Sequence, residues 1–147
     1  MKIRPKIALP LGILVILSLF PFPYLAAPRW SVRVVDETGQ PLAGMTVRLS
    51  WENYSVENTS HEQDLESDQN GNVVFPPHRS SAMLSSRVFY TVLSSMALAH
   101  ASYGPHASAF AFGKGREGDI VDRDIVVDWN GTPDEMHSQI VAARLKD

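Results

Sequence analysis

The feature that most constrains the fold is a two-residue period in the placement of apolar side chains. It is most regular over residues 45–52, where the apolar positions are Met45, Val47, Leu49 and Trp51. Successive side chains of a β-strand point to opposite faces of the sheet, so this pattern predicts a strand with one buried face. A strand of this kind has to cover that face with a second layer, which restricts the chain to a small number of architectures.

Several other segments show the same period and are bounded by turn-forming residues. The further predicted strands are residues 30–36, 73–75, 108–112, 125–129 and 137–145. Residues 36–44 and 68–72 are rich in Asp, Asn, Gly and Pro, which is typical of turns. Residues 53–66 lack a period and are expected to form a long loop or an irregular edge strand. About six short strands of this kind predict a mainly β protein, an antiparallel β-sandwich.

Residues 80–99 have a different pattern. Apolar residues recur at four-residue spacing, with two more beside them, at Leu84, Phe89, Val88, Val92, Leu93 and Met96. The stripe predicts one inserted helix packed on the sandwich, with Ser80 or Ser81 as its N-cap. Residues 88–92 are also rich in β-prone side chains, so a strand is the alternative.

The first 29 residues have the pattern of a targeting segment. Lys2, Arg4 and Lys6 precede residues 7–27, which are 21 residues without a charge. This length suits a membrane-spanning helix, and basic residues before it place the N-terminus in the cytoplasm. We therefore expect residues 1–29 to be a single-pass signal-anchor and residues 30–147 to be a domain facing the periplasm or exterior. If the leader is cleaved, the domain is secreted.

Composition excludes several classes of function. The net charge is −3 over the whole chain, and without the three N-terminal basic residues 10 basic face 16 acidic residues, which gives −6. Nucleic-acid binding needs clustered Lys and Arg, so no nucleic-acid partner is expected. Cysteine is absent, which rules out disulfides and thiolate metal sites.

No catalytic or cofactor-binding motif is present. The five histidines are scattered, without the spacing by which helices or strands present zinc ligands. His100 and His106 flank a Tyr-Gly-Pro turn at residues 103–105 and are the best metal candidates, although exposed or core histidines are favoured over a metal site. We therefore predict no catalytic residue, no cofactor and no enzymatic activity.

Four aromatic residues fall in period with predicted strands, namely Trp51, Phe110, Phe112 and Trp129. Sugars stack on aromatic rings, so these side chains could line a glycan-binding face. Their position in the strand period favours packing in the core instead.

One part of the chain resembles a known family. The pattern is Val32-x-Val34-x-Asp36-x-x-Gly39-x-Pro41-Leu42-Ala43-Gly44-x-x-Val47-x-Leu49, followed by Asp68-x-x-Gly71-x-Val73-x-Phe75. It is similar to carboxypeptidase regulatory-like domains, and the similarity covers about residues 31–77. The resemblance implies a transthyretin-like, or Ig-like, sandwich that serves as a scaffold or binding module without catalysis. The helix at residues 80–99 departs from that pattern.

These observations predict a membrane-anchored, non-enzymatic binding or accessory domain outside the cytoplasm. Its expected partners are the membrane, through residues 7–27, and an envelope protein or a glycan. One alternative is a structural subunit of a cell-envelope assembly, which would expose an apolar patch on the inserted helix. Another is a transthyretin-like hydrolase or metal-dependent enzyme. The Tyr-Arg-Gly-Ser-type ending of such hydrolases does not match residues 142–147 here.

Overall fold

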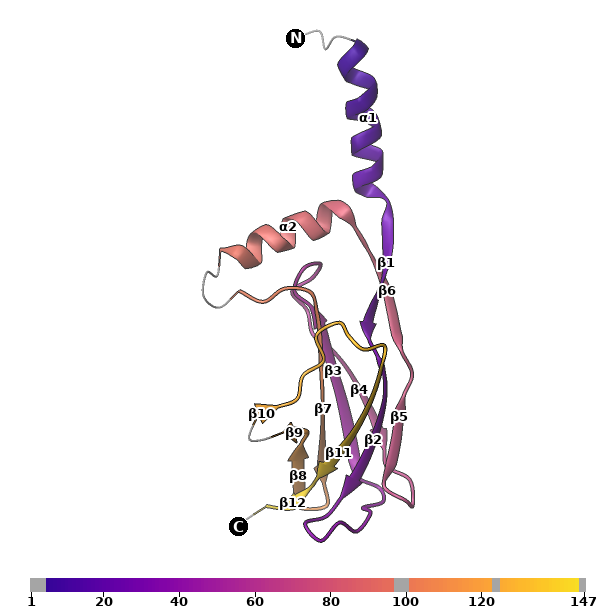
Figure 1. The fold of residues 1–147 in the computed structure, drawn as a ribbon, viewed down its shortest axis with the longest axis vertical. Coiled ribbons are helices and arrows are strands. Elements are labelled where there is room, and N and C mark those ends of the chain that lie inside the picture. The colour runs from indigo at the N-terminus through magenta and orange to yellow at the C-terminus, as the bar shows by residue number, and fades with distance from the viewer. Residues whose placement is uncertain (1–4, 97–100, 123–124, 146–147) are drawn as a thin grey trace.

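The computed structural model describes residues 5–96, 101–122 and 125–145 (Figure 1). Within these residues the chain is mainly β, as predicted, with two helices. In chain order the elements are α1 Pro5–Leu19, β1 Pro21–Ala27, β2 Arg29–Val35, β3 Thr46–Asn53, β4 His61–Glu66, β5 Asn72–Phe75, β6 His78–Met83, α2 Leu84–Ser95, β7 Pro105–Gly113, β8 Arg116–Asp119, β9 Val121–Asp122, β10 Ile125–Val126, β11 Glu135–Val141 and β12 Ala143–Arg144.

Two sheets form the body of the molecule. The larger has five strands in the order β12-β8-β7-β3-β4, and the smaller has three in the order β11-β2-β5. Strands β1 and β6 pair with each other and extend from the body toward α1 (Figure 1). Strands β9 and β10 form a short ladder of their own.

The core lies between the two main sheets and contains side chains from both. Its large, fully buried members include Trp30, Leu49, Phe75, Trp129 and Ile140. Strand β7 contributes only alanines to it, because its inward positions are residues 107, 109 and 111. Small side chains on β7 therefore share the core with large aromatic ones from the other elements.

The strand predictions are largely confirmed. The most regular segment forms β3 and pairs with β4 on one side and β7 on the other. Residues 53–66, for which a loop or an edge strand was predicted, divide into an irregular part and the edge strand β4. The predicted strand at residues 125–129 is shorter, with two residues in β10 and an isolated bridge from Trp129 to Ala107.

One strand pair departs from the antiparallel prediction. Strand β11 pairs with β2 in parallel, from Glu135 beside Arg29 to Val141 beside Val35. A parallel neighbour needs a connection that returns the chain to the same end of the sheet. The whole chain between β2 and β11 provides that connection, so the period along each strand could not reveal the direction of pairing.

The turn at residues 68–72 shows why glycine is needed there. Asp68 accepts backbone hydrogen bonds from Asn70 and Asn72 through Oδ1, both at 2.8 Å. Gly71 has φ +77°, and a Cβ atom on it would lie 2.4 Å from the carbonyl oxygen of Val34. The motif glycine thus lets the β4–β5 turn lie directly against β2.

The N-terminal apolar segment is not one continuous helix, which corrects the prediction for residues 7–27. Helix α1 ends at Leu19, and Pro21–Ala27 forms strand β1. Two prolines in β1 lack the backbone N–H that a helix needs, and Ala27 at its end is fully buried in the core. In the described residues, no helix combines the length and apolar character needed to cross a membrane.

The inserted helix is present but differs from the prediction at its start and in its packing. Residues 78–83 form β6, so the N-cap is Met83 and neither predicted serine caps the helix. None of the helix residues is buried. The predicted packing of the apolar stripe on the sandwich is therefore wrong, and the stripe faces outward.

Candidate functional site

Of the two predicted metal candidates, the structure describes only His106. His106 is the second residue of β7, where Nε2 lies 3.1 Å from the carbonyl oxygen of Tyr103 and the ring meets the edge of Tyr54. His100 lies outside the described residues. Across the described ranges, no group of three His, Asp or Glu side chains is placed to hold a metal ion.

The four aromatic residues singled out in the sequence divide between the inside and the outside. Trp129 is buried, and its Nε1 donates a 2.6 Å hydrogen bond to the carbonyl oxygen of Pro133. Trp51 is partly buried at the margin of the core. Phe110 and Phe112 lie on the face of β7 opposite its buried alanines. The prediction of core packing is therefore wrong for these two phenylalanines.

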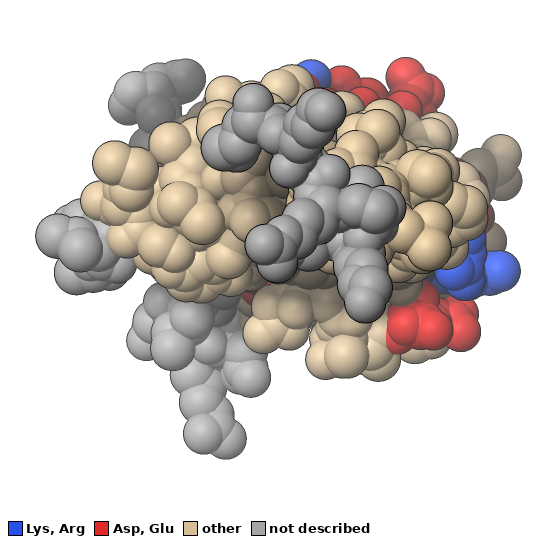
Figure 2. All heavy atoms as spheres, turned by 90° about the horizontal axis from the view of Figure 1, so that it is seen from above, with Lys and Arg blue, Asp and Glu red and all other residues tan. Residues whose placement is uncertain are grey.

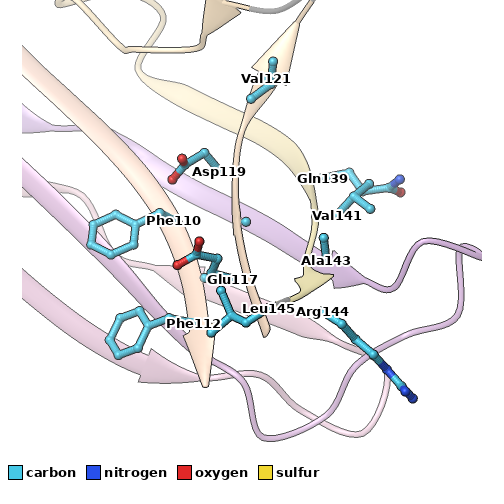
Figure 3. A pocket seen from close by; sticks show the side chains of 12 residues that line it. Phe110, Phe112, Glu117, Asp119, Val121, Gln139, Val141, Ala143, Arg144 and Leu145 are labelled. Carbon is cyan, nitrogen blue, oxygen red and sulfur yellow. The ribbon is translucent and has the colours of Figure 1, made fainter. Parts of the chain in front are cut away.

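Phe110 and Phe112 form part of an open groove on the outer face of the five-stranded sheet. In the β7–β8 register Phe110 is opposite Asp119 and Phe112 is opposite Glu117, so each ring has a carboxylate beside it (Figure 3). The two rings are 5.7 Å apart between centroids. We call this feature, with Val141 on its other side, the outer groove; its volume is about 740 Å³.

Charge around the outer groove is unevenly distributed. On the neighbouring strand, Arg48 lies 5.5 Å from the centre of the Phe112 ring and forms ion pairs with Asp64 at 2.7 Å and Glu62 at 2.8 Å. Its hydrogen bonds lower the pKa of Asp64. Among the described residues, Glu117 forms no ion pair, and neither does the aspartate opposite Phe110. The groove therefore offers two aromatic rings and two carboxylates that keep their acceptor capacity.

Glu37 fixes the wall of the outer groove formed by β12. Its Oε1 accepts a 2.9 Å hydrogen bond from the backbone N–H of Arg144, and its Oε2 pairs with Arg116 at 2.6 Å. These donors, with the backbone N–H of Glu37 itself, lower its pKa to about 2. Arg116 also donates to the carbonyl oxygen of Ala142, so the loop after β2 holds the last strand in place.

A second cluster surrounds Trp51 at the other edge of the sheet. The ring of His78 stacks on Trp51 at 4.2 Å, and the ring of His61 stacks at 5.7 Å. His61 pairs with Glu57 at 2.9 Å, while His78 hydrogen-bonds to Gln63 at 2.8 Å. Burial lowers the pKa of His78, which favours its neutral form. A cavity of about 190 Å³ adjoins these rings.

A third hollow, of about 220 Å³, is also lined by Trp51. Its polar side chains include Glu52, Tyr54, His106 and Asp128. Burial, followed by the nearby charge of Glu57, raises the pKa of Glu52. The hollow can bind a small polar group, but no nucleophile and base are within hydrogen-bond distance of each other among these side chains.

Sequence reasoning missed the histidine–tryptophan cluster for two reasons: the β3–β4 hairpin was not recognised, and His78 comes from a strand farther along the chain. Trp51 and His61 are direct partners in the β3–β4 ladder. The residues before β4 carry no periodic signal, so the hairpin was not recognisable. His78 comes from β6, and only the three-dimensional fold places it on Trp51. The alternation of His61, Gln63 and Leu65 was the one signal that pointed to β4.

Comparison with known proteins does not identify a family for this chain. No protein-family model and no curated protein matches this chain. Among solved structures, 3-chlorocatechol 1,2-dioxygenase from Rhodococcus opacus 1CP is similar with a TM-score of 0.49 and 13% sequence identity. The match covers 82% of this chain and 61% of that one, so the chain spans about three fifths of its length.

Proposed function

We propose that this chain is a non-catalytic binding domain, held at a membrane by its N-terminal segment, and that the outer groove is its ligand site. The observation that carries the proposal is the placement of Phe110 and Phe112 outside the core, each with a carboxylate beside it. Large aromatic side chains on an open sheet face stabilise the fold little. They are well suited to contact a ligand.

The chemistry of the outer groove favours a glycan as the ligand. The apolar face of a sugar ring stacks on aromatic side chains, and its hydroxyl groups donate hydrogen bonds to carboxylates. Glu117 and Asp119 are placed to accept such bonds beside the two phenyl rings (Figure 3).

The position at a membrane is supported by the exposed apolar surface of α1. Its side chains from residue 9 onward are mostly exposed, with Leu9 at 71% and Ile16 at 70%. We propose that α1 tethers the chain as a signal-anchor, with the sandwich in the periplasm or exterior. From residue 9 onward these apolar side chains are in contact with water, and a lipid environment would remove that contact.

We also propose that the sandwich is of the transthyretin-like type found in carboxypeptidase regulatory-like domains. The motif glycines Gly39 and Gly44 have φ +83° and +64°. Both therefore adopt the left-handed backbone that the resemblance requires of them. Asp36 accepts hydrogen bonds from the backbone of Thr38 and Gln40, which closes the loop between β2 and β3.

The glycan proposal is tested by binding of the full chain, in detergent, to insoluble polysaccharides such as peptidoglycan sacculi and chitin. Phe110→Ala and Phe112→Ala together should abolish retention. Phe89→Ala, which removes an exposed phenylalanine elsewhere, should leave retention unchanged. Equal retention of the wild type and the double variant would exclude the outer groove as the site.

The location is tested by protease accessibility in a bacterial host. With a tag at the C-terminus, externally added protease should digest the tag in spheroplasts, while a cytoplasmic control protein stays intact. A tag that survives until the cells are lysed would place the domain in the cytoplasm and contradict the proposal.

A second candidate function is a structural subunit of an envelope assembly. One observation favours it: Val88, Phe89 and Val92 of α2 are more than half exposed. A subunit of this kind should copurify from detergent with a fixed stoichiometry of another envelope protein. Purification of the chain alone, under conditions that preserve known envelope complexes, would count against it.

A further inference from the structure

Helix α2 is oriented opposite to an ordinary amphipathic helix on a soluble domain. Its outward residues are apolar and exposed: Leu84, Val88, Phe89, Val92, Leu93 and Met96. Its half-buried residues are mostly polar and include Arg87, Thr91 and Ser94. The helix thus turns its polar side toward the protein and its apolar side away from it.

Polar contacts hold α2 in this orientation. Ser94 donates a 3.0 Å hydrogen bond through Oγ to the carbonyl oxygen of Tyr54, the residue after β3. Arg87 donates to the carbonyl oxygen of Phe22 at 3.4 Å, and its guanidinium lies 5.5 Å from the ring centre of Tyr24 on β1. Two separate elements of the fold therefore fix which side of the helix faces out.

The apolar side of α2 is continuous with the apolar surface of α1. The two helices contact each other, and α2 runs across the direction of α1 at the same end of the molecule (Figure 1). Seen from that end, the described surface is mostly uncharged, and the visible Lys, Arg, Asp and Glu residues lie toward the rim (Figure 2). Arg87 is the one charged residue within α2 itself, and it is turned toward β1.

This arrangement is the geometry expected of a helix at a lipid surface. A bilayer that surrounds α1 has its surface across the α1 axis, which is the direction in which α2 lies. An interfacial helix buries its apolar side at the boundary between headgroups and acyl chains. A protein partner would also cover the stripe, but it would not explain why the stripe lies at the same end as the apolar α1.

We propose that α2 lies flat in the membrane–water interface, with its apolar side among the lipids and its polar side on the sandwich. The inference rests on the proposed membrane tether, since α1 defines which surface α2 meets. It adds a second membrane contact, which would fix the sandwich upright instead of letting it pivot about α1.

The test uses single-cysteine variants of the full chain, which contains no cysteine of its own. An environment-sensitive fluorophore is attached at Val92→Cys on the apolar side of α2. Matched probes are placed at Leu14→Cys in α1 and at Gln40→Cys in the exposed loop between β2 and β3. The proteins are reconstituted in vesicles of phosphatidylcholine and phosphatidylglycerol, and quenching is measured with aqueous iodide and with spin-labelled lipid.

If α2 lies in the interface, the probe at Val92 should be quenched severalfold more by spin-labelled lipid than the probe at Gln40, and severalfold less by iodide. Equal behaviour of these two probes would overturn the inference. The Leu14 probe separates the two proposals, because lipid quenching there with none at Val92 leaves the tether intact and excludes only α2. The probe at Val92 could instead be shielded from iodide in native membranes but not in the reconstituted vesicles, which contain no other protein. That result would assign the stripe to a protein partner and also overturn the inference.

A fold control accompanies the probes. Val92→Asp should reduce lipid quenching of a probe at Val88→Cys while leaving the unfolding transition of the sandwich unchanged, because residue 92 is exposed and lies outside the core. A Val92→Asp chain that keeps full lipid quenching at residue 88 would contradict the inference.

Discussion

Strand β3 and helix α2 each carry a regular apolar stripe, yet the two stripes face opposite surroundings. On β3, Val47 and Leu49 are fully buried between the sheets. On α2, Val92 is 59% and Met96 is 73% exposed. The period of apolar residues therefore tells which side of an element is apolar. It does not tell whether the rest of the chain covers that side.

The largest expected effect separates the two regions by stability. Phe75→Ala removes a fully buried ring from the core and should lower the free energy of unfolding by about 3–5 kcal/mol. Phe89→Ala on α2 should change it by no more than about 0.5 kcal/mol, because the ring is exposed. Denaturant titration in mild detergent, followed by tryptophan fluorescence, measures both. Similar losses would mean that α2 packs on the sandwich after all.

A smaller effect concerns the polar attachment of α2. Arg87→Ala removes the cation–π contact with Tyr24 and a long hydrogen bond to β1. We expect about 0.5–1 kcal/mol less protection of α2 amides in hydrogen exchange, with the core amides unchanged. Ser85→Ala, at an exposed position of the same helix, is the matched control. Loss of protection throughout the sandwich would show that α2 is part of its cooperative unit.

The third prediction concerns the pH dependence of stability that arises from His78 on strand β6. This strand lies directly before α2, and its His78 stacks on Trp51 of β3. Burial lowers the pKa of His78 below its ordinary 6.5, so the folded chain disfavours the protonated ring. Below pH 6.5 the unfolded chain binds more protons, and stability should therefore decrease as the pH falls through that value. His78→Phe, which keeps a ring beside Trp51, should flatten this part of the stability curve. An unchanged pH dependence in the variant would assign the titration to another group.

The smallest effect lies at the far end of the sandwich. Glu37 has its pKa lowered to about 2 by the backbone of Arg144 and by Arg116. Its contribution to stability is thus fully present above pH 4.5 and is lost as the pH falls toward 2. Glu37→Gln should be slightly less stable than wild type at neutral pH, and the difference should disappear near pH 2. A difference that persists at pH 2 would show that the carboxylate charge is unimportant.

The local sequence pattern was sufficient to predict where most strands lie, but not which side of each strand is buried. The unbroken alternation of residues 45–52 has one apolar side, so β3 was predictable in both extent and orientation. Strand β7 has alanines on one side and Phe110 and Phe112 on the other. Both sides are apolar, and hydrophobicity alone favoured placing the phenylalanines inside. The large side chains that reach the core from other strands leave space for alanine on β7, and this is information that the strand itself does not contain.

The two candidate sites differ in how far apart in the sequence their contacting residues are. Glu117 and Asp119 are brought beside the phenylalanines by the β7–β8 hairpin, and its glycine-containing loop was visible in the sequence. The stacking of His61 and His78 on Trp51 combines strands β3, β4 and β6. No local pattern indicates which strands become neighbours, so this cluster required the structure.

The junction between α1 and β1 has a mechanical consequence. One residue, Phe20, separates the helix from the strand, and β1 then continues to the fully buried Ala27 while paired with β6. A flexible linker is therefore missing at this junction. The β1–β6 pair forms a stalk that runs about 23 Å along β1, and the last part of it is buried against the body of the protein. If α1 lies in a bilayer, as proposed, this stalk acts as a rigid spacer that holds the outer groove at a fixed height above the lipid. The proposed ligand would then have to extend that far from the membrane to be bound.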